Sequence, residues 1–157
     1  MRNIIFIHGL ESSGKGFKGT MFKEKLPNCL TPDFTGDLEQ RMEQLEKILD
    51  EKEKWVLIGS SFGGLMSALY ASQFPEKVSF MILLAPLLVH PKLKPGKRPL
   101  VHSPVVVYHG NNDKVIPLQQ SRTQAEKIFS YLIYKVVDDD HKLHSTVKEI
   151  DWRGIIY

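Results

Sequence analysis

The sequence predicts an α/β protein, a three-layer sandwich with a mostly parallel sheet between two layers of helices. Two observations predict this class. Short continuous apolar runs, of the kind found in strands buried on both faces, recur along the chain. Stretches with helical spacing of apolar residues separate them. Such an alternation gives parallel strands that are joined by right-handed crossovers.

The apolar runs are the predicted strands. They span residues 3–7, 28–32, 55–59, 78–84, 105–109 and 131–137. The first predicted helix, residues 37–54, carries its apolar side chains on one stripe, and Asp37 with Gln40 supplies a capping pair at its start. Further helices are expected at residues 62–74, at residues 118–129 and near the C-terminus.

Length and composition predict a single domain, residues 1–157, with a substantial core. The net charge of +3 comes with no basic block interleaved with aromatic residues, so no nucleic-acid partner is expected. Cys29 stands alone, which excludes an internal disulfide framework and predicts a small buried hydrophobe. No apolar run is long enough to span a membrane, and the cytoplasm is the expected location.

The glycine-rich stretch IFIHGLESSGKG follows the first predicted strand and fits most of a phosphate-binding loop. In that loop the residue after Lys15 must carry a hydroxyl group to hold Mg²⁺, and here it is Gly16. No later predicted strand ends in the aspartate that would complete the metal site. The nucleotide interpretation is therefore rejected. A glycine at the carboxyl end of a strand, such as Gly9, can instead present backbone N–H groups to an oxyanion.

A candidate nucleophile lies where the third predicted strand meets the next helix. The stretch from Gly59 to Gly63 reads Gly-Ser-Ser-Phe-Gly, a G-x-S-x-G pattern in which Ser61 is the central serine. The flanking glycines leave room for a strained turn that lifts the serine hydroxyl group above the sheet. The alternative is a Gly/Ser-rich turn with a structural role alone.

An activated serine needs a base and an orienting carboxylate. In a fold of this kind both follow the serine along the chain, first the Asp or Glu and then the His. Asp113 lies in the loop GNNDKVIP after the fifth predicted strand, where the alternative is an ordinary turn-forming aspartate. His141 follows the last strand and is favoured as the base, with His144 left open as an alternative. The acidic run 138–140 is expected to form a solvated turn.

The remaining histidines receive no catalytic role. His8 is expected to have a structural role in the first glycine loop. No partner can be identified from the sequence for His90, His102 or His109, so each is assigned to the surface or to packing.

Four stretches together resemble the α/β-hydrolase superfamily: HGLESSGKG, GSSFGG, HGNNDKVIP and DDDHKL. More narrowly, HGLESS with GSSFGG resembles small, nearly lidless bacterial esterases. The resemblance implies attack by Ser61, proton transfer by His141 and orientation of the imidazole by Asp113. It also implies that the backbone N–H groups of Leu10 and Phe62 bind the oxyanion. Such enzymes act on small-molecule esters or thioesters through an acyl-enzyme and use neither a metal nor an organic cofactor.

Two departures from the superfamily pattern concern the antiparallel edge hairpin and the cap. The antiparallel edge hairpin has no counterpart, and the cap is reduced to residues 87–103, where four basic residues occur without an acidic one. This segment is either a solvated loop or a basic flap that favours anionic substrates. The alternatives to an esterase are a thioesterase, an amidase, C–C hydrolase or acyltransferase with the same three residues, and a catalytically silent binding protein.

Overall fold

The computed structural model describes residues 1–157 and contains one six-stranded sheet in the order β2-β1-β3-β4-β5-β6. Every strand pairs in parallel with its neighbours, so the predicted α/β class is confirmed. The strands are β1 (Asn3–Ile7), β2 (Cys29–Leu30), β3 (Trp55–Ser60), β4 (Val78–Leu84), β5 (Val105–Gly110) and β6 (Leu132–Val137).

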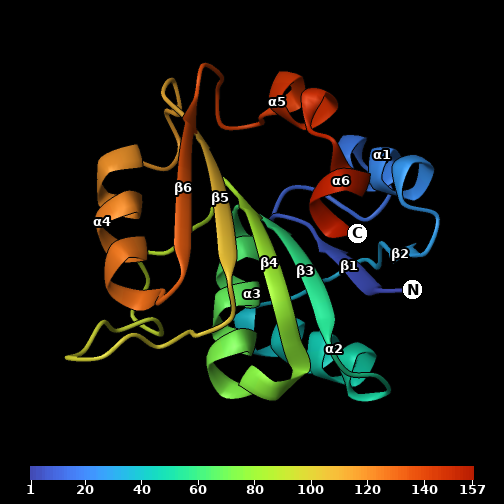
Figure 1. The fold of residues 1–157 in the computed structure, drawn as a ribbon, viewed down its shortest axis with the longest axis horizontal. Coiled ribbons are helices and arrows are strands. Elements are labelled where there is room, and N and C mark those ends of the chain that lie inside the picture. Colours follow the sequence, from blue (N-terminus) through green and yellow to red (C-terminus); the bar gives the residue numbers. More distant parts are fainter.

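Helices cover both faces of this sheet (Figure 1). One apolar core joins the sheet to α2 (Leu38–Asp50), α3 (Phe62–Gln73) and α4 (Leu118–Ile128). A second, smaller core joins the opposite face to α1 (Phe17–Lys25), α5 (His144–Glu149) and α6 (Trp152–Ile156). A short 3₁₀ helix, Pro75–Lys77, connects α3 to β4. None of the helices is both long and apolar enough to cross a membrane.

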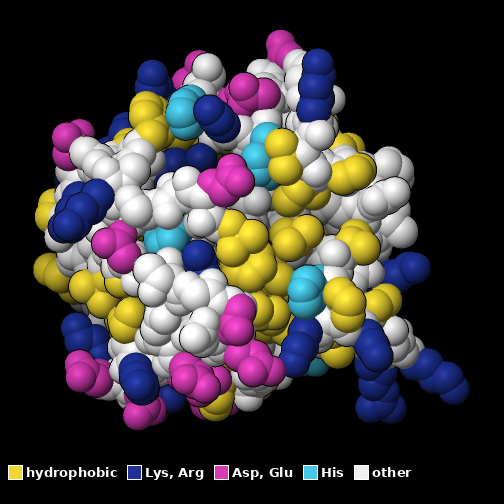
Figure 2. Space-filling view, turned by 180° about the vertical axis from the view of Figure 1, so that it is seen from behind, with side chains coloured by type: hydrophobic (Ala, Val, Ile, Leu, Met, Phe, Trp, Pro, Cys, Tyr) yellow, Lys and Arg dark blue, Asp and Glu magenta, His cyan; other side chains and the backbone are white.

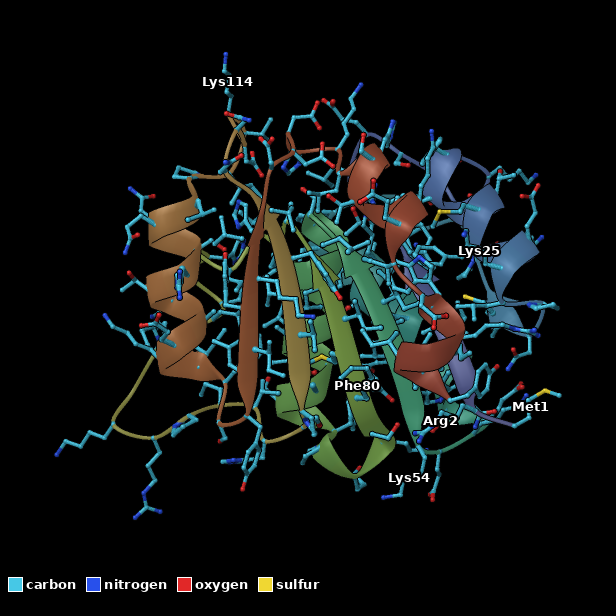
Figure 3. The ribbon with its side chains drawn as sticks, turned by 45° about the horizontal axis from the view of Figure 1, so that its top comes forward. Met1, Arg2, Lys25, Lys54, Phe80 and Lys114 are labelled. Atoms are coloured by element: carbon cyan, nitrogen blue, oxygen red, sulfur yellow. The ribbon has the colours of Figure 1, made fainter.

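The two sheet faces differ in how completely they are covered. In Figure 1 the helices of the smaller core lie over β1, β2 and β3, while the front of β5 and β6 is bare. Phe80, labelled in Figure 3, lies on this front face and is partly buried against the smaller core. Figure 2, seen from the other side, shows apolar side chains gathered near the middle of the face formed by α2, α3 and α4.

Helix α1 was not predicted, because its sequence FKGTMFKEK has almost no apolar stripe. Its N-cap, Gly16, supplies no capping side chain, and only three of its residues are buried. One of them is Gly19, where a Cβ atom would overlap the carbonyl oxygen of Gly14. The helix therefore depends on tertiary packing of Phe22 against Phe6 and Trp152 rather than on local signals.

Helix α2 begins as predicted and ends earlier. Asp37 accepts a hydrogen bond from the backbone N–H of Gln40 at 2.9 Å, and the Gln40 side chain accepts one from the backbone N–H of Asp37 at 2.9 Å. This capping box fixes the first turn. The helix stops at Asp50 rather than at residue 54, and the chain then turns through Lys54, whose φ of 59° lies in the left-handed region.

Candidate active site

All strands end at one edge of the sheet, the upper edge in Figure 1, and Ser61 lies there between β3 and α3. Its φ of 54° and ψ of −112° are strained for a residue with a side chain. The Ser61 N–H donates to the Leu84 carbonyl at 2.9 Å, and the Ser61 carbonyl accepts from the N–H groups of Gly64 and Leu87, each at 2.9 Å. Bonds on both sides of the residue hold this strained turn in place.

The glycines around Ser61 are required by close backbone approach. A Cβ atom on Gly63 would overlap the carbonyl oxygen of Ile7 in β1, and one on Gly59 would overlap the Ser67 hydroxyl group. A Cβ atom on Gly64 would come within 2.6 Å of Cβ of Pro86. The turn can therefore sit tightly between the central strands only with glycine at these positions.

His141 lies between the other two predicted side chains. Its Nδ1 is 2.7 Å from Oδ2 of Asp113, and its Nε2 is 3.2 Å from Oγ of Ser61. Since the carboxylate can only accept, Nδ1 carries the proton and Nε2 is free to accept from the serine hydroxyl group. The structure thus brings Ser61, Asp113 and His141 together, in the order that a proton relay needs.

His144 lies elsewhere. It is the first residue of α5, and its ring stacks on Phe17 with the ring centroids 4.0 Å apart. Burial lowers the pKa of His144, and the neighbouring charges of Lys18 and Lys142 lower it further. Of the two histidines left open by the sequence, only His141 contacts Ser61.

The side chain of Asp113 is fully buried and accepts three hydrogen bonds. Oδ1 accepts from the backbone N–H groups of Val115 and Ile116, both at 2.8 Å, and Oδ2 accepts from His141 at 2.7 Å. Nε2 of His109 lies 3.1 Å from the same Oδ2. Burial alone would raise the pKa of the Asp113 carboxyl group, but these hydrogen bonds outweigh it and the pKa is lowered. The carboxylate is therefore held charged and in a fixed orientation.

His109 is the residue at this site that sequence reasoning missed. It is completely buried at the end of β5, and its Nε2 lies 3.1 Å from both Oδ2 of Asp113 and the carbonyl oxygen of Ile116. Two acceptors at Nε2 place the proton there, so Nδ1 accepts from the Tyr134 hydroxyl group at 2.6 Å. Burial lowers the pKa of His109 despite the nearby carboxylate. Its position four residues before Asp113, at a strand end, was the available signal.

The loop after β6, which carries His141, is fixed by hydrogen bonds of Asp139, one of its three aspartates. Asp139 Oδ2 accepts from the N–H and the hydroxyl group of Thr146, at 3.0 and 2.7 Å, and the Asp139 carbonyl accepts from the N–H of Asn112 at 3.0 Å. Burial would raise the pKa of Asp139, but the bonds from Thr146 and from the Asp140 N–H lower it. Asp138 and Asp140 are exposed, so the predicted solvated turn holds for them and not for Asp139.

The first glycine loop lies against the serine. A Cβ atom on Gly9 would be 3.5 Å from Cβ of Ser61. The N–H of Leu10 donates no hydrogen bond within the chain. Phe62 is the first residue of α3, so its N–H is among those without an acceptor inside the helix. Two donors are thus available beside the Ser61 hydroxyl group.

His8 holds the peptide that carries one of these donors. Its Nδ1 donates to the carbonyl of Gly9 at 2.6 Å, and its Nε2 accepts from the N–H of Phe34 at 2.8 Å. The Gly9 carbonyl and the Leu10 N–H belong to one trans peptide and point in opposite directions. His8 is 1% exposed, and burial is the main cause of its lowered pKa. A neutral His8 therefore fixes the direction of the Leu10 N–H.

The basic-flap hypothesis for residues 87–103 is wrong. Near the end of this segment, the N–H of Leu100 donates to Ile128, and Val101 bridges to Phe129, just before β6 begins. The preceding loop projects at the amino ends of the strands, the edge opposite Ser61 (Figure 1), where long Lys and Arg side chains extend from the molecule (Figure 2). The cations of this projecting loop therefore lie at the wrong end of the sheet, and Lys92 is 3.9 Å from a carboxylate oxygen of Glu39 in α2. Lys114, in the loop between β5 and α4 that carries Asp113, points outward into solvent (Figure 3).

The fold and these side chains define a class, an α/β protein with a serine, histidine and aspartate at the carboxyl edge of its sheet. The family model of the alpha/beta hydrolase fold matches residues 22–101, which is half of the chain, and the chain belongs to this family. The predicted superfamily is confirmed. No curated protein sequence matches the chain.

Solved structures share this fold. An alpha/beta-superfamily protein from Xanthomonas campestris pv. campestris is 28% identical, with a TM-score of 0.75 over 94% of this chain and 92% of that one. Alpha/beta hydrolase domain-containing protein 10 from mouse is 21% identical, with a TM-score of 0.73 over 93% and 88%. Est1E from Butyrivibrio proteoclasticus, with ferulic acid bound, is 15% identical, with a TM-score of 0.76 over 100% and 90%.

Proposed function

We propose that this protein is a serine hydrolase that cleaves carboxylic esters through an acyl-enzyme. The observation that carries the proposal is His141, whose two ring nitrogens contact the Asp113 carboxylate and the Ser61 hydroxyl group at once. A second support is the strained backbone of Ser61, which presents that hydroxyl group above the sheet edge.

In the first half of the reaction, Ser61 Oγ attacks the ester carbonyl carbon while its proton passes to Nε2 of His141. The carbonyl oxygen becomes an oxyanion, which accepts hydrogen bonds from the N–H groups of Leu10 and Phe62. Asp113 stabilises the imidazolium that has formed. The tetrahedral intermediate then collapses, Nε2 returns the proton to the departing alkoxide, and the alcohol leaves with the acyl group still on Ser61.

In the second half, a water molecule takes the place of the alcohol. His141 Nε2 accepts one of its protons as the oxygen attacks the acyl carbon, and the same two N–H groups stabilise the second oxyanion. Collapse breaks the bond to Ser61 Oγ, which takes the proton back from Nε2. The products are a carboxylic acid and the original serine.

Labelling with a fluorophosphonate tests the proposal directly, because the reagent reacts with activated serines. We expect one adduct on the wild-type protein by intact mass spectrometry, and none on Ser61→Ala. Ser60→Ala is the matched control, since it removes the neighbouring hydroxyl group of the same motif, and it should still be labelled. Labelling of Ser61→Ala to the wild-type extent would refute the assignment.

A substrate screen then separates the related activities. p-Nitrophenyl esters of graded chain length are compared with thioesters and with an anilide, each on wild-type protein and on Ser61→Ala. We expect turnover of esters that depends on Ser61. Turnover of thioesters alone would move the activity to the thioesterase class, and labelling without turnover of any of these compounds would point to another acyl-transfer reaction.

A further inference from the structure

Arg41 is a buried charge with no counter-charge. It is 7% exposed, on the side of α2 that faces the sheet. Its Nε donates to the carbonyl of Gly36 at 2.9 Å, but Nη1 is buried and has no hydrogen-bond partner. Nη2 donates no hydrogen bond either, and it is not among the fully enclosed polar atoms. No carboxylate oxygen lies within the 4.0 Å of an ion pair.

Such an arrangement is unfavourable for folding alone. A guanidinium group stays charged at any pH that proteins experience, so burial cannot be relieved by loss of a proton. A buried charge is usually paired and its donors are usually satisfied. The cation–π contact with Phe62, whose ring centroid lies 5.7 Å from Cζ of Arg41, compensates only part of the lost hydration.

The location of Arg41 connects it to the candidate active site. Phe62 directly follows Ser61 and supplies one of the two oxyanion donors of the proposed mechanism. Arg41 also acts on His8, whose pKa its charge helps to lower after the larger effect of burial. The guanidinium group therefore lies near residues from both sides of the proposed reaction centre, Phe62 and His8.

The start of α2 holds Arg41 in this place. Gly36, whose carbonyl accepts from Nε, has a φ of 94°, and the capping box of Asp37 and Gln40 follows at once. Arg122, in contrast, shows the usual surroundings of an arginine, which is exposed and paired with a carboxylate. It also lies over an aromatic ring, 5.6 Å from the centroid of Tyr134, but it is on the exposed side of α4 and pairs with Glu126 at 3.4 Å.

We propose that Arg41 binds a carboxylate group carried by the ester substrate, so that the preferred substrates are anionic esters. This inference rests on the proposed function, since it concerns the substrate of the same site. Nη1 is enclosed by the protein, but Nη2 has no partner and is not fully enclosed, so a carboxylate can accept a charge-assisted hydrogen bond from Nη2. The bound carboxylate would also supply the missing counter-charge.

Two pairs of esters test this inference. p-Nitrophenyl hydrogen adipate carries a carboxylate on the acyl side, and p-nitrophenyl methyl adipate is its neutral match. 4-Acetoxybenzoate carries one on the alcohol side, and its methyl ester is the neutral match. We expect Arg41→Met to lower the ratio of kcat/KM for the anionic to the neutral ester about 10- to 100-fold in one of the two pairs. The affected pair identifies the side that carries the carboxylate.

Control variants separate a specific contact from a general loss of charge. Arg122→Met removes the same side chain from an equivalent ring contact and should leave both ratios unchanged. Arg41→Lys keeps the charge without the planar fork and should fall between wild type and Arg41→Met. Equal ratios in wild type and Arg41→Met, for both pairs, would overturn the inference. If Arg41→Met does not fold, Arg41→Lys with wild-type ratios in both pairs would overturn it.

A binding measurement keeps this inference separate from the proposed reaction. Adipamate and its neutral counterpart adipamide are titrated into wild-type protein and Arg41→Lys by calorimetry, which needs no turnover. 4-Acetamidobenzoate and its methyl ester are titrated in the same way for the alcohol side. We expect wild-type protein to bind the anion at least tenfold more tightly than its neutral match in one of the two pairs, with a smaller difference in the variant. Equal affinities within both pairs would refute the carboxylate site even if the protein hydrolyses esters. Tighter adipamate binding by a protein that neither labels nor hydrolyses would support the site and refute the proposed function.

Discussion

The molecule contains two serine–histidine pairs, at opposite edges of the sheet. At the carboxyl edge, Nε2 of His141 is 3.2 Å from Oγ of Ser61. At the amino edge, Nδ1 of His102 is 2.7 Å from Oγ of Ser130, so the shorter contact belongs to the second pair. His102 and Ser130 are both exposed, and no carboxylate contacts His102.

The two pairs differ in their surroundings rather than in proximity. His141 has a buried carboxylate behind it, Ser61 has a strained backbone, and two N–H groups are free beside it. The pair at the amino edge lacks a carboxylate, and neither Ser130 nor His102 has a positive φ. A buried carboxylate behind the imidazole and a strained serine backbone, rather than a short hydrogen bond, distinguish the candidate active site.

The largest expected effect tests this comparison at the two serines. Ser61→Ala removes the proposed nucleophile, and we expect kcat for ester hydrolysis to fall by several orders of magnitude, up to about 10⁶-fold. Ser130→Ala removes the hydroxyl group with the shorter hydrogen bond and should leave kcat unchanged. Steady-state kinetics with p-nitrophenyl esters measure both. A Ser61→Ala rate within tenfold of wild type, or a large loss in Ser130→Ala, would reverse the assignment of the two pairs.

The next effect concerns the carboxylate that only one pair has. In Asp113→Asn the amide can donate to Nδ1 of His141, which favours the tautomer whose Nε2 carries a proton and cannot accept one from Ser61. We expect kcat to fall about 10⁴-fold. Asp138→Asn changes an exposed aspartate of the neighbouring loop and serves as the control. An Asp113→Asn enzyme with nearly full activity would mean that the carboxylate does not distinguish the two pairs.

A smaller effect tests the backbone under Ser61. In Gly63→Ala the new methyl group would overlap the carbonyl oxygen of Ile7, so β1 and α3 must move apart. We expect the free energy of unfolding in urea to fall by about 3 kcal/mol. Gly96→Ala is the matched control, because a Cβ atom there meets nothing within 4 Å, and it should change stability by less than about 0.5 kcal/mol. Equal stabilities would show that the turn is looser than the structure indicates.

The sequence was sufficient where a feature depends on residues close together in the chain. The apolar runs predicted all six strands, and Asp37 with Gln40 predicted the start of α2. The turn at Ser61 was predictable because its glycines and its serine are neighbours in the chain. Boundaries shifted by one to four residues, since neighbouring elements rather than local preferences decide where an element ends.

Contacts between distant segments that no sequence motif marks were missed. His109 contacts Tyr134 only because β5 and β6 are adjacent, and its position four residues before Asp113 gives no sign of this partner. Arginine is ordinarily expected at the surface of a helix, and only the packing of α2 on α3 reveals that Arg41 is buried with Leu45 and Leu49. The basic residues in 87–103 suggested a flap near the substrate for the same reason, because composition does not tell at which edge of the sheet a loop lies.

The last comparison sets the buried histidines behind the candidate active site against exposed His102. Burial lowers the pKa values of His8 and His109 below 6.5 in the folded chain. Below about pH 6.5 the unfolded chain therefore binds more protons, and the free energy of unfolding should decrease as pH falls towards the folded-state values. Urea unfolding at several pH values measures this slope, to which each histidine adds at most about 1.4 kcal/mol per pH unit. His109→Gln should flatten the slope, and His102→Gln, which touches neither ring, is the control. An unchanged slope in His109→Gln would show that folding does not lower the pKa of this imidazole.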